Sequence, residues 1–329
     1  MTTPRSRLFV IFLTVFIDLA GFGLILPILP YYAQRFGAGG LEFGALIGVY
    51  SLMQFLATTF LGRLSDRVGR RPILLVSILI SLVGYVIFTV AGSYSVLFLA
   101  RTVSGFSAGN ISVAQAYIAD VTSAADRSRG MGLIGAAFGL GFIVGPALGG
   151  VAGHYGGPAA VGLTAAALCV VNVVTAYFIL PESLKAEHRV ARRLLDVQHL
   201  VRGLRDSRLG PLFVVFGLIP FGFSGFMVGL PLYAAAQLGW AEKELGWFFA
   251  IIGMVAAVVQ GWLFGKIAPR VGDRRMAIAG TFGMAIPIAV VPFVGSTTGL
   301  YLWVVALALA NSMASPALTG LISTFAGAT

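Results

Sequence analysis

Long apolar stretches recur along the chain, and short polar segments separate them. Each stretch is about 18–25 residues long, which is the length that an α-helix needs to cross the hydrocarbon core of a bilayer, about 30 Å thick. The pattern therefore predicts an all-α membrane protein. Ten membrane-spanning helices are predicted, at residues 8–32, 43–61, 73–90, 96–118, 131–152, 159–180, 212–236, 245–264, 276–294 and 300–322.

Positive charge is distributed unevenly among the connecting segments. If the N-terminus faces the cytoplasm, two of the 22 Lys and Arg residues lie outside (Arg35 and Lys243), Arg101 lies within a span, and the remaining 19 lie on the cytoplasmic side. This asymmetry predicts a multi-pass protein of the bacterial inner membrane with a cytoplasmic N-terminus. The net charge of +10 follows from that topology, so we expect membrane lipids and no nucleic acid as partners.

Composition supports a membrane protein over a soluble one. Hydrophobic residues make up 58% of the chain and charged residues 10%, whereas about a quarter of a soluble domain is charged. No GxxxxGK[ST] loop for ATP, no zinc-ligand spacing and no Ser/His/Asp arrangement is present in the sequence. We therefore expect neither an enzyme nor a bound cofactor or metal. Because no ATP-binding loop is present, any energy-requiring movement across the membrane is expected to draw on a proton gradient.

One long polar connection, residues 182–210, separates an N-terminal half (1–181) from a C-terminal half (211–329). Its apolar residues recur at helical spacing with basic residues between them, which predicts an amphipathic helix on the anionic inner leaflet. A solvated linker is the alternative. The apolar residues in question are Val190, Leu194, Val197, Val201 and Leu204.

The two halves resemble each other in sequence. GRLSDRVGRR at 62–71 follows the second predicted span, and GKIAPRVGDR at 265–274 follows the eighth. Two parallel six-helix halves around a central cavity form one of the known transporter plans. In this register the second half is expected to lack its last two helices, so the chain is expected to be a fragment or a truncated product.

Asp18 is the acidic residue that lies deep within a predicted span. A charged aspartate at the bilayer centre costs about 2.5–3.5 kcal/mol on insertion scales. A carboxyl group that gains and loses a proton at such a place is what a proton-coupled carrier needs. The alternative is a structural acid, permanently paired with Arg101 or bonded to the backbone.

Arg101 is the basic residue within a span, on the fourth predicted helix. An unpaired arginine at that depth is costly, so we expect Asp18, Gln54 or a backbone carbonyl as its partner. If the partner is Asp18, the pair couples proton and substrate movement. A static tether between helices is the alternative.

The loop between the second and third spans carries the most specific motif. Gly62 and Gly69 allow close helix approach and a tight turn. Asp66 is expected to cap a neighbouring helix N-terminus, where the helix dipole favours an anion. Cytoplasmic loops are commonly basic, which accounts for the arginines of the motif but not for the spacing of its glycines and aspartate. The arginines are Arg63, Arg67, Arg70 and Arg71.

The fifth span contains small residues and a proline at intervals that permit close helix packing in lipid and a bend. A role in gating and a role in packing alone remain equally open. The residues are Gly139, Gly141, Gly145, Pro146, Gly149 and Gly150.

Few polar groups remain within the spans to line a cavity, and mostly apolar walls suit a lipophilic substrate. Aromatic residues of the seventh span are candidates for its walls, although aromatics within spans commonly serve packing. The predicted substrate-binding residues are Gln54, Asn110, Gln115, Phe223, Phe226 and Asn311.

Together these motifs resemble the major facilitator superfamily, and within it the drug–proton antiporters related to tetracycline efflux proteins. The 62–71 loop is similar to the superfamily signature between helices two and three. The segment from Asp18 to Pro30 resembles the first-helix motif of those exporters, and Arg101-x-x-x-Gly105-x-x-x-Gly109 resembles the fourth-helix motif, whose arginine is implicated in proton transfer. The glycines of the fifth span resemble the antiporter motif.

The resemblance implies a bundle of two six-helix halves that works as a monomeric, proton-driven exporter of lipophilic, drug-like compounds by alternating access. The alternatives are a proton-coupled symporter of a sugar or small metabolite, which the fifth-span motif disfavours, and a non-transporting membrane sensor. Two departures limit what carries over from the family pattern. Pro269 replaces Asp66 in the second copy of the loop, so only the first half can form the acid cap. Tetracycline pumps have further essential acids associated with the third and ninth helices, where this chain has none, so tetracycline itself is not expected.

Overall fold

The computed structural model describes residues 4–122, 127–184 and 209–326, and all of its regular elements are helices. The predicted amphipathic helix of the central connection lies outside the described residues. The helices form two compact units. The first contains α1 to α7 together with Glu242–Trp247, the first residues of α10, and the second contains α9 and the helices from Phe248 onward.

Seven helices of the first unit follow one another up to residue 179. The first, α1, is broken from the short α2 at residues 26–28, where Pro27 has no N–H to continue the helical ladder. The seventh, α7, bends at Gly157, whose φ of 64° and ψ of −163° are not helical. The elements are α1 (Pro4–Ile25), α2 (Leu29–Gln34), α3 (Gly40–Val68), α4 (Arg70–Thr89), α5 (Tyr94–Ser107), α6 (Asn110–Val121) and α7 (Arg127–Ile179).

The second unit repeats the pattern of long helices with local interruptions. A π-helical stretch, Val259–Leu263, separates α10 from α11, and a 3-10 turn, Val291–Phe293, follows α12. Its core contains Met276 and Ala277 of α12 packed against Ala317 and Leu318 of α13. The helices are α9 (Leu209–Leu238), α10 (Glu242–Val258), α11 (Phe264–Val271), α12 (Asp273–Val290) and α13 (Thr297–Ala326).

The predicted all-α membrane architecture is confirmed. Within the described residues, seven helices are long and apolar enough to cross a bilayer. One of them, Ala136–Ile179, has 44 residues and at about 1.5 Å per residue is long enough to cross twice. It contains both the fifth and the sixth predicted spans, on either side of the bend at Gly157. The other eight predicted spans also fall on described helices.

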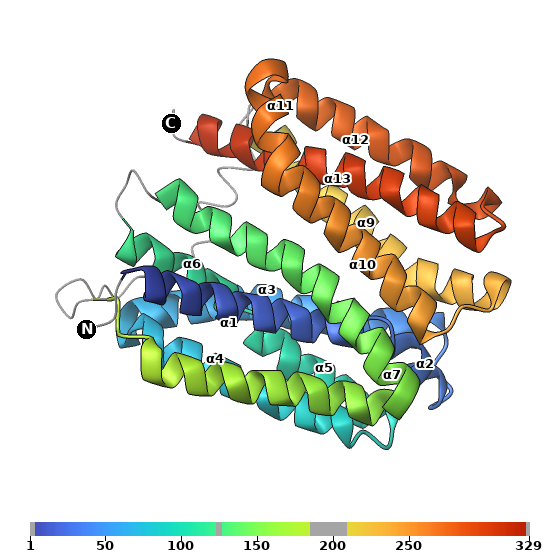
Figure 1. Ribbon diagram of the computed structural model, residues 1–329, viewed down its shortest axis with the longest axis horizontal. Coiled ribbons are helices and arrows are strands. Elements are labelled where there is room, and N and C mark those ends of the chain that lie inside the picture. The colour runs from blue at the N-terminus through green and yellow to red at the C-terminus, as the bar shows by residue number, and fades with distance from the viewer. Residues whose placement is uncertain (1–3, 123–126, 185–208, 327–329) are drawn as a thin grey trace. The chain divides into compact units, whose positions relative to one another are not determined.

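The bend gives α7 two arms, a first arm of residues 127–156 and a second arm of residues 158–179. In Figure 1, α1 lies between these two arms. Glycines bring the first arm close to α1. A Cβ added at Gly145 would lie 2.5 Å from the Ala20 carbonyl oxygen, and one at Gly149 would meet the Leu24 carbonyl. Two of the predicted antiporter-motif glycines therefore set the distance between α1 and α7.

Replacing Gly145 by alanine should force α1 and α7 apart. We expect the free energy of unfolding to fall by about 1–3 kcal/mol, which is typical of overpacking. Thermal unfolding of the purified protein in detergent measures the change. Gly48→Ala is the matched control, because a Cβ at this position in α3 meets nothing within 4 Å. Equal unfolding temperatures for the two variants would contradict the packing role.

Candidate functional site

Asp18 lies midway along α1, and its carboxyl group contacts α6. Asn110, the first residue of α6, donates a hydrogen bond from Nδ2 to Asp18 Oδ2. The other carboxyl oxygen, Asp18 Oδ1, is buried and accepts no hydrogen bond from any described residue. Asn110 is 1% exposed, and its own Oδ1 is also buried without a partner. The sequence predicted both residues as functional but did not predict that they contact each other.

Arg101 of α5 is held by aromatic rings. Its guanidinium carbon lies 4.3 Å from the ring centroid of Tyr50 and 5.6 Å from that of Phe22. The side chain is 1% exposed, and its Nε and Nη2 are buried without an acceptor among the described residues. Ring faces attract a cation, and they do so more strongly when both are shielded from water. Tyr50 is a site residue that sequence reasoning missed.

The predicted contact between Arg101 and Asp18 does not form in this structure. Asp18 takes Asn110 as its partner, and Arg101 lies about two and a half helical turns nearer the outer end of the α5–α6 pair. Between the described residues Gln54 and Arg101 no hydrogen bond forms either; Gln54 Nε2 donates to the Ala108 carbonyl oxygen at 3.5 Å, and Arg101 Nε and Nη2 have no acceptor. The cation and the carboxyl group both lie near Tyr50 without forming an ion pair.

A second polar cluster lies at the predicted cytoplasmic end of the first unit, around Arg70. Its Nη2 lies 2.6 Å from Asp66 Oδ1 and its Nε 3.2 Å from Asp120 Oδ2. Its Nη1 also donates to Ser65 Oγ at 2.6 Å. Because Arg70 is 7% exposed, this one side chain ties α3, α4 and α6 together in a shielded ionic contact.

The acid that caps α4 in this cluster is Glu182, and the prediction that Asp66 caps a helix N-terminus stays a prediction. Glu182 Oε1 accepts from the Arg70 backbone N–H at 2.9 Å, and Oε2 accepts from that of Arg71 at 3.3 Å. The reason is geometric: α4 begins directly after Gly69, whose φ is 124°, and its first N–H groups face the segment that follows α7. Asp66 pairs with the Arg70 side chain instead.

The remaining motif residues surround this cluster or line α7. Arg71 donates from Nη2 to the Tyr177 carbonyl oxygen at 2.8 Å, while Arg63 and Arg67 belong to the last turns of α3. Gly62 accepts from Ser65 Oγ through its carbonyl oxygen. Of the other α7 positions, Gly141 and Pro146 pack against α1, Gly150 is buried and Gly139 is half-buried.

The other predicted substrate-binding residues are spread over the two units. Gln115 is exposed on α6, Asn311 is half-buried on α13, and the Phe223 side chain lies outside the described residues. Phe226 is the one that lines a pocket. Among the residues that the structure describes, no three His, Cys, Asp or Glu side chains gather as metal ligands would.

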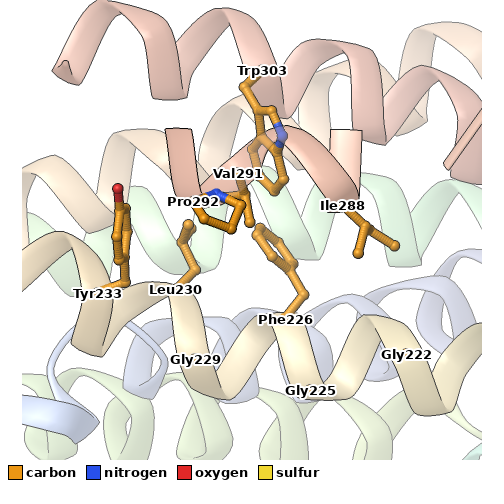
Figure 2. Close-up of a pocket in the computed structure, with 10 residues that line it drawn as sticks. All are labelled: Gly222, Gly225, Phe226, Gly229, Leu230, Tyr233, Ile288, Val291, Pro292 and Trp303. Atoms are coloured by element: carbon orange, nitrogen blue, oxygen red, sulfur yellow. The ribbon is translucent and has the colours of Figure 1, made fainter. Parts of the chain in front are cut away.

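The pocket lies within the second unit and has a volume of about 290 Å³. Figure 2 shows Phe226 reaching up from α9 and Trp303 reaching down from α13 on either side of it. Their ring centroids are 4.9 Å apart, and Trp303 Nε1 donates to the Pro287 carbonyl oxygen at 2.6 Å, which fixes the indole. The lining is almost entirely apolar: Gly222, Gly225, Phe226, Gly229, Leu230, Tyr233, Ile288, Val291, Pro292 and Trp303.

Comparison with known proteins places these features in a family. A family model described as Major Facilitator Superfamily matches residues 11–329. The chain belongs to the major facilitator superfamily. The resemblance read from the motifs is thereby confirmed, and the protein is a membrane transporter of the drug-efflux type.

Two curated relatives show where in the superfamily the chain falls. It is 30% identical over 334 residues to multidrug resistance protein 2 of Bacillus subtilis (strain 168), an alignment that covers 98% of this chain and 82% of that protein. It is 32% identical over 329 residues to the class C tetracycline resistance protein of Escherichia coli, covering 97% of this chain and 81% of that one.

Solved structures agree with the fold. The human organic anion transporter MFSD10 (TETRAN) superposes with a TM-score of 0.72 at 26% identity, covering 97% of this chain and 85% of that one. A bacterial homologue of the human lysosomal transporter Spinster, in an inward-facing and unoccupied conformation, superposes with a TM-score of 0.79. At 17% identity the second likeness concerns the fold alone; it covers 97% of this chain and 74% of that one.

Replacing Glu182 by alanine should remove the acceptor that caps α4 in this superfamily member. We expect the free energy of unfolding to fall by about 0.5–1 kcal/mol, the lower part of the range for lost helix caps, because the carboxylate is partly solvated. Thermal unfolding in detergent measures the loss. Glu182→Gln keeps one amide oxygen as acceptor and should lose less. An alanine variant as stable as the parent would rule out the cap.

Proposed function

We propose that the protein exports lipophilic, drug-like small molecules across a bacterial inner membrane in exchange for protons, by alternating access. One observation carries the proposal. The Asp18 carboxyl group lies in a membrane-spanning helix with one oxygen bonded to Asn110 and the other buried without a partner in the described part of the chain. A carboxyl group in this setting is suited to exchanging a proton.

Asn110 is a partner that serves both charge states of Asp18. Its Nδ2 donates to Asp18 Oδ2 whether the other carboxyl oxygen is protonated or not, whereas an arginine partner would hold the acid in its ionised form. Arg101, the arginine considered as a partner for Asp18, lies against the rings of Tyr50 and Phe22 instead. This favours a proton-exchanging acid over the alternative of a permanent structural ion pair.

The proposed cycle uses the cost of a charge in hydrocarbon. A proton from outside neutralises Asp18, and the neutral acid remains within the hydrocarbon at a much lower free energy than the ion while access to the site changes from one side of the membrane to the other. Release of that proton toward the cytoplasm resets the carrier, and the substrate moves in the opposite direction. The Arg70 contacts with Asp66 and Asp120 support this scheme, since they tie three helices into a body that moves as one.

The substrate class follows from the second unit and from the relatives. An almost wholly apolar pocket with Phe226 and Trp303 at its walls suits a lipophilic, ring-containing molecule. Relatives at 30% and 32% identity are resistance proteins for multiple drugs and for tetracycline. Tetracycline itself is not proposed, because the described part of α4 contains no acid and α12 has one only at its first residue, Asp273.

Replacing Asp18 by asparagine should abolish proton-driven accumulation while leaving the carrier able to exchange substrate. The assay uses everted membrane vesicles with an acidic interior and the neutral lipophilic dye N-phenyl-1-naphthylamine. We expect no uphill uptake by Asp18→Asn, because the amide cannot take up and release the proton, but retained dye counterflow without a pH gradient. Glu42→Gln, an exposed acid of α3, is the control. Uphill uptake by Asp18→Asn at the parental level would refute proton coupling through this residue.

Replacing Phe226 by alanine should weaken substrate affinity. Because the variant lacks one aromatic wall of the pocket, we expect its KM for the dye to rise by about tenfold. The maximal rate should change little. Initial rates of dye uptake over a concentration series provide both constants. Phe282→Ala is the control, since this α12 side chain is 72% exposed and does not line the pocket. If both variants show the same KM, the pocket does not bind the dye.

A further inference from the structure

A second polar contact lies one helical turn from Asp18, toward the N-terminus of α1. Thr14 Oγ1 donates to Asn172 Oδ1 of the second arm of α7 at 3.1 Å. Thr14 is 1% exposed and Asn172 is not exposed at all. Because residues four apart share one face of a helix, Thr14 and Asp18 point from α1 in similar directions. This pair has no role in the proposed transport cycle described above.

Asn172 and Asp18 each have one buried polar side-chain atom that makes no hydrogen bond to a described residue. The two atoms are Asn172 Nδ2 and Asp18 Oδ1. Exchanging the oxygen and nitrogen of the Asn172 amide would still leave one polar atom spare. Buried polar atoms are nearly always hydrogen-bonded. The unpaired donor of Asn172 and the unpaired acceptor of Asp18 lie at levels about one helical turn apart on neighbouring helices, which points to a third group between them.

The geometry suits a single water molecule. The second arm of α7 runs antiparallel to α1, with Asn172 level with Thr14 and with Cys169, three residues earlier, within electrostatic reach of Asp18. One helical turn rises about 5.4 Å, and two hydrogen bonds of about 2.8 Å that meet at one water at a roughly tetrahedral angle join partners about 4.6 Å apart, which is close to that rise. Such a water would accept from Asn172 Nδ2 and donate to Asp18 Oδ1 and Thr14 Oγ1, within the two to four partners that a buried water needs.

We propose that Thr14 and Asn172 hold an ordered water beneath Asp18 and that this water is the first step by which the Asp18 proton leaves toward the cytoplasm. The proposal rests on the proposed function. In the step, the O–H bond of protonated Asp18 breaks, the water takes up that proton and passes one of its own protons inward, and Asp18 remains as a carboxylate. Thr14 and Asn172 orient the water and neither gains nor loses a proton, so both are positioning residues.

The inner side of this site is closed in the present conformation. Val10 lies one turn before Thr14 in α1, and Ala176 lies one turn after Asn172 in α7. Both are buried, and so is Ile11. Their apolar side chains lie between the water site and the N-terminal end of α1. In the proposed step, the proton therefore leaves when the helices separate at this end, as coupled exchange requires.

No titratable group belongs to the pair itself, so its replacement leaves the charges around Asp18 in place. The groups that face Asp18 from the neighbouring helices are Tyr50 of α3, Tyr85 of α4 and Cys169 of α7, with Arg101 of α5 nearby. Asn172→Leu and Thr14→Val are close in size to the native residues. They remove polar atoms without adding or removing a charge.

Infrared difference spectroscopy tests the water independently of transport. In the purified full chain, titrated with acid, the C=O band of protonated Asp18 is identified by its loss in Asp18→Asn. Exchange into H₂¹⁸O is expected to reveal the O–H band of an ordered water that titrates with it. In Asn172→Leu the water band should vanish and the Asp18 C=O band should move to higher frequency. Thr164→Val is the control, because Thr164 Oγ1 donates to the Ala160 carbonyl oxygen of its own helix.

Transport then tests the role of the water. We expect Asn172→Leu and Thr14→Val to slow proton-driven dye uptake by about tenfold, within the range for positioned proton transfer, and to change its dependence on cytoplasmic pH but not on outside pH. Counterflow of the dye and its KM should stay within about twofold of the parent. Asn172→Ser, which keeps a polar group, should recover part of the rate and provides the test if the leucine variant does not fold.

The two proposals fail in different ways. An Asp18 C=O band that is the same in Asn172→Leu as in the parent, or the absence of a titrating water band in the parent, overturns the water site whatever the transport result. Unchanged proton-driven uptake in both variants, with the infrared shifts present, overturns its role in proton release. A parent that shows the water band but no proton-driven uptake overturns the proposed function and leaves the water site standing.

Discussion

The constraint on which the structure depends is that a polar group inside a bilayer must find its partner within the protein, because the hydrocarbon offers none. This constraint governs α1. Its two interior polar residues, Thr14 and Asp18, bond to Asn172 and Asn110, which come from two different helices. The two bonds fix the rotation of α1 about its own axis, and the glycines of α7 allow it to approach closely. The packing of the first unit follows from satisfying these few groups.

Ionic and neutral polar contacts are divided between two levels of the first unit. At the predicted cytoplasmic end, Arg70 forms ion pairs with Asp66 and Asp120, and the Glu182 carboxylate accepts from the first backbone N–H groups of α4. Within the spans, an amide contacts Asp18 and aromatic rings surround Arg101. The division has a functional consequence: acids fixed by arginine hold helices together, whereas an acid bonded to an amide can change its charge.

The second unit carries the same repeat with a different content. Pro269 stands where the first half has Asp66, and among its described helices α12 has its single acid at Asp273, at the start of the helix. In place of a buried charge it has an apolar pocket between Phe226 and Trp303. In the proposed function, the first unit supplies the proton site and the second unit supplies the apolar contact surface for a lipophilic molecule.

The sequence by itself determined the membrane-spanning helices and the family and singled out Asp18 as a candidate, because hydrophobic length, motif spacing and a charge within an apolar run are local properties of the chain. Only the tertiary structure decided the partners. The Asp18–Asn110 and Thr14–Asn172 bonds join residues 92 and 158 positions apart, and Glu182 reaches Arg70 across 112 positions. Such pairs depend on how helices rotate and pack against each other. For the same reason Arg101, for which the sequence offered Asp18, Gln54 or a backbone carbonyl as partner, lies on the rings of Tyr50 and Phe22.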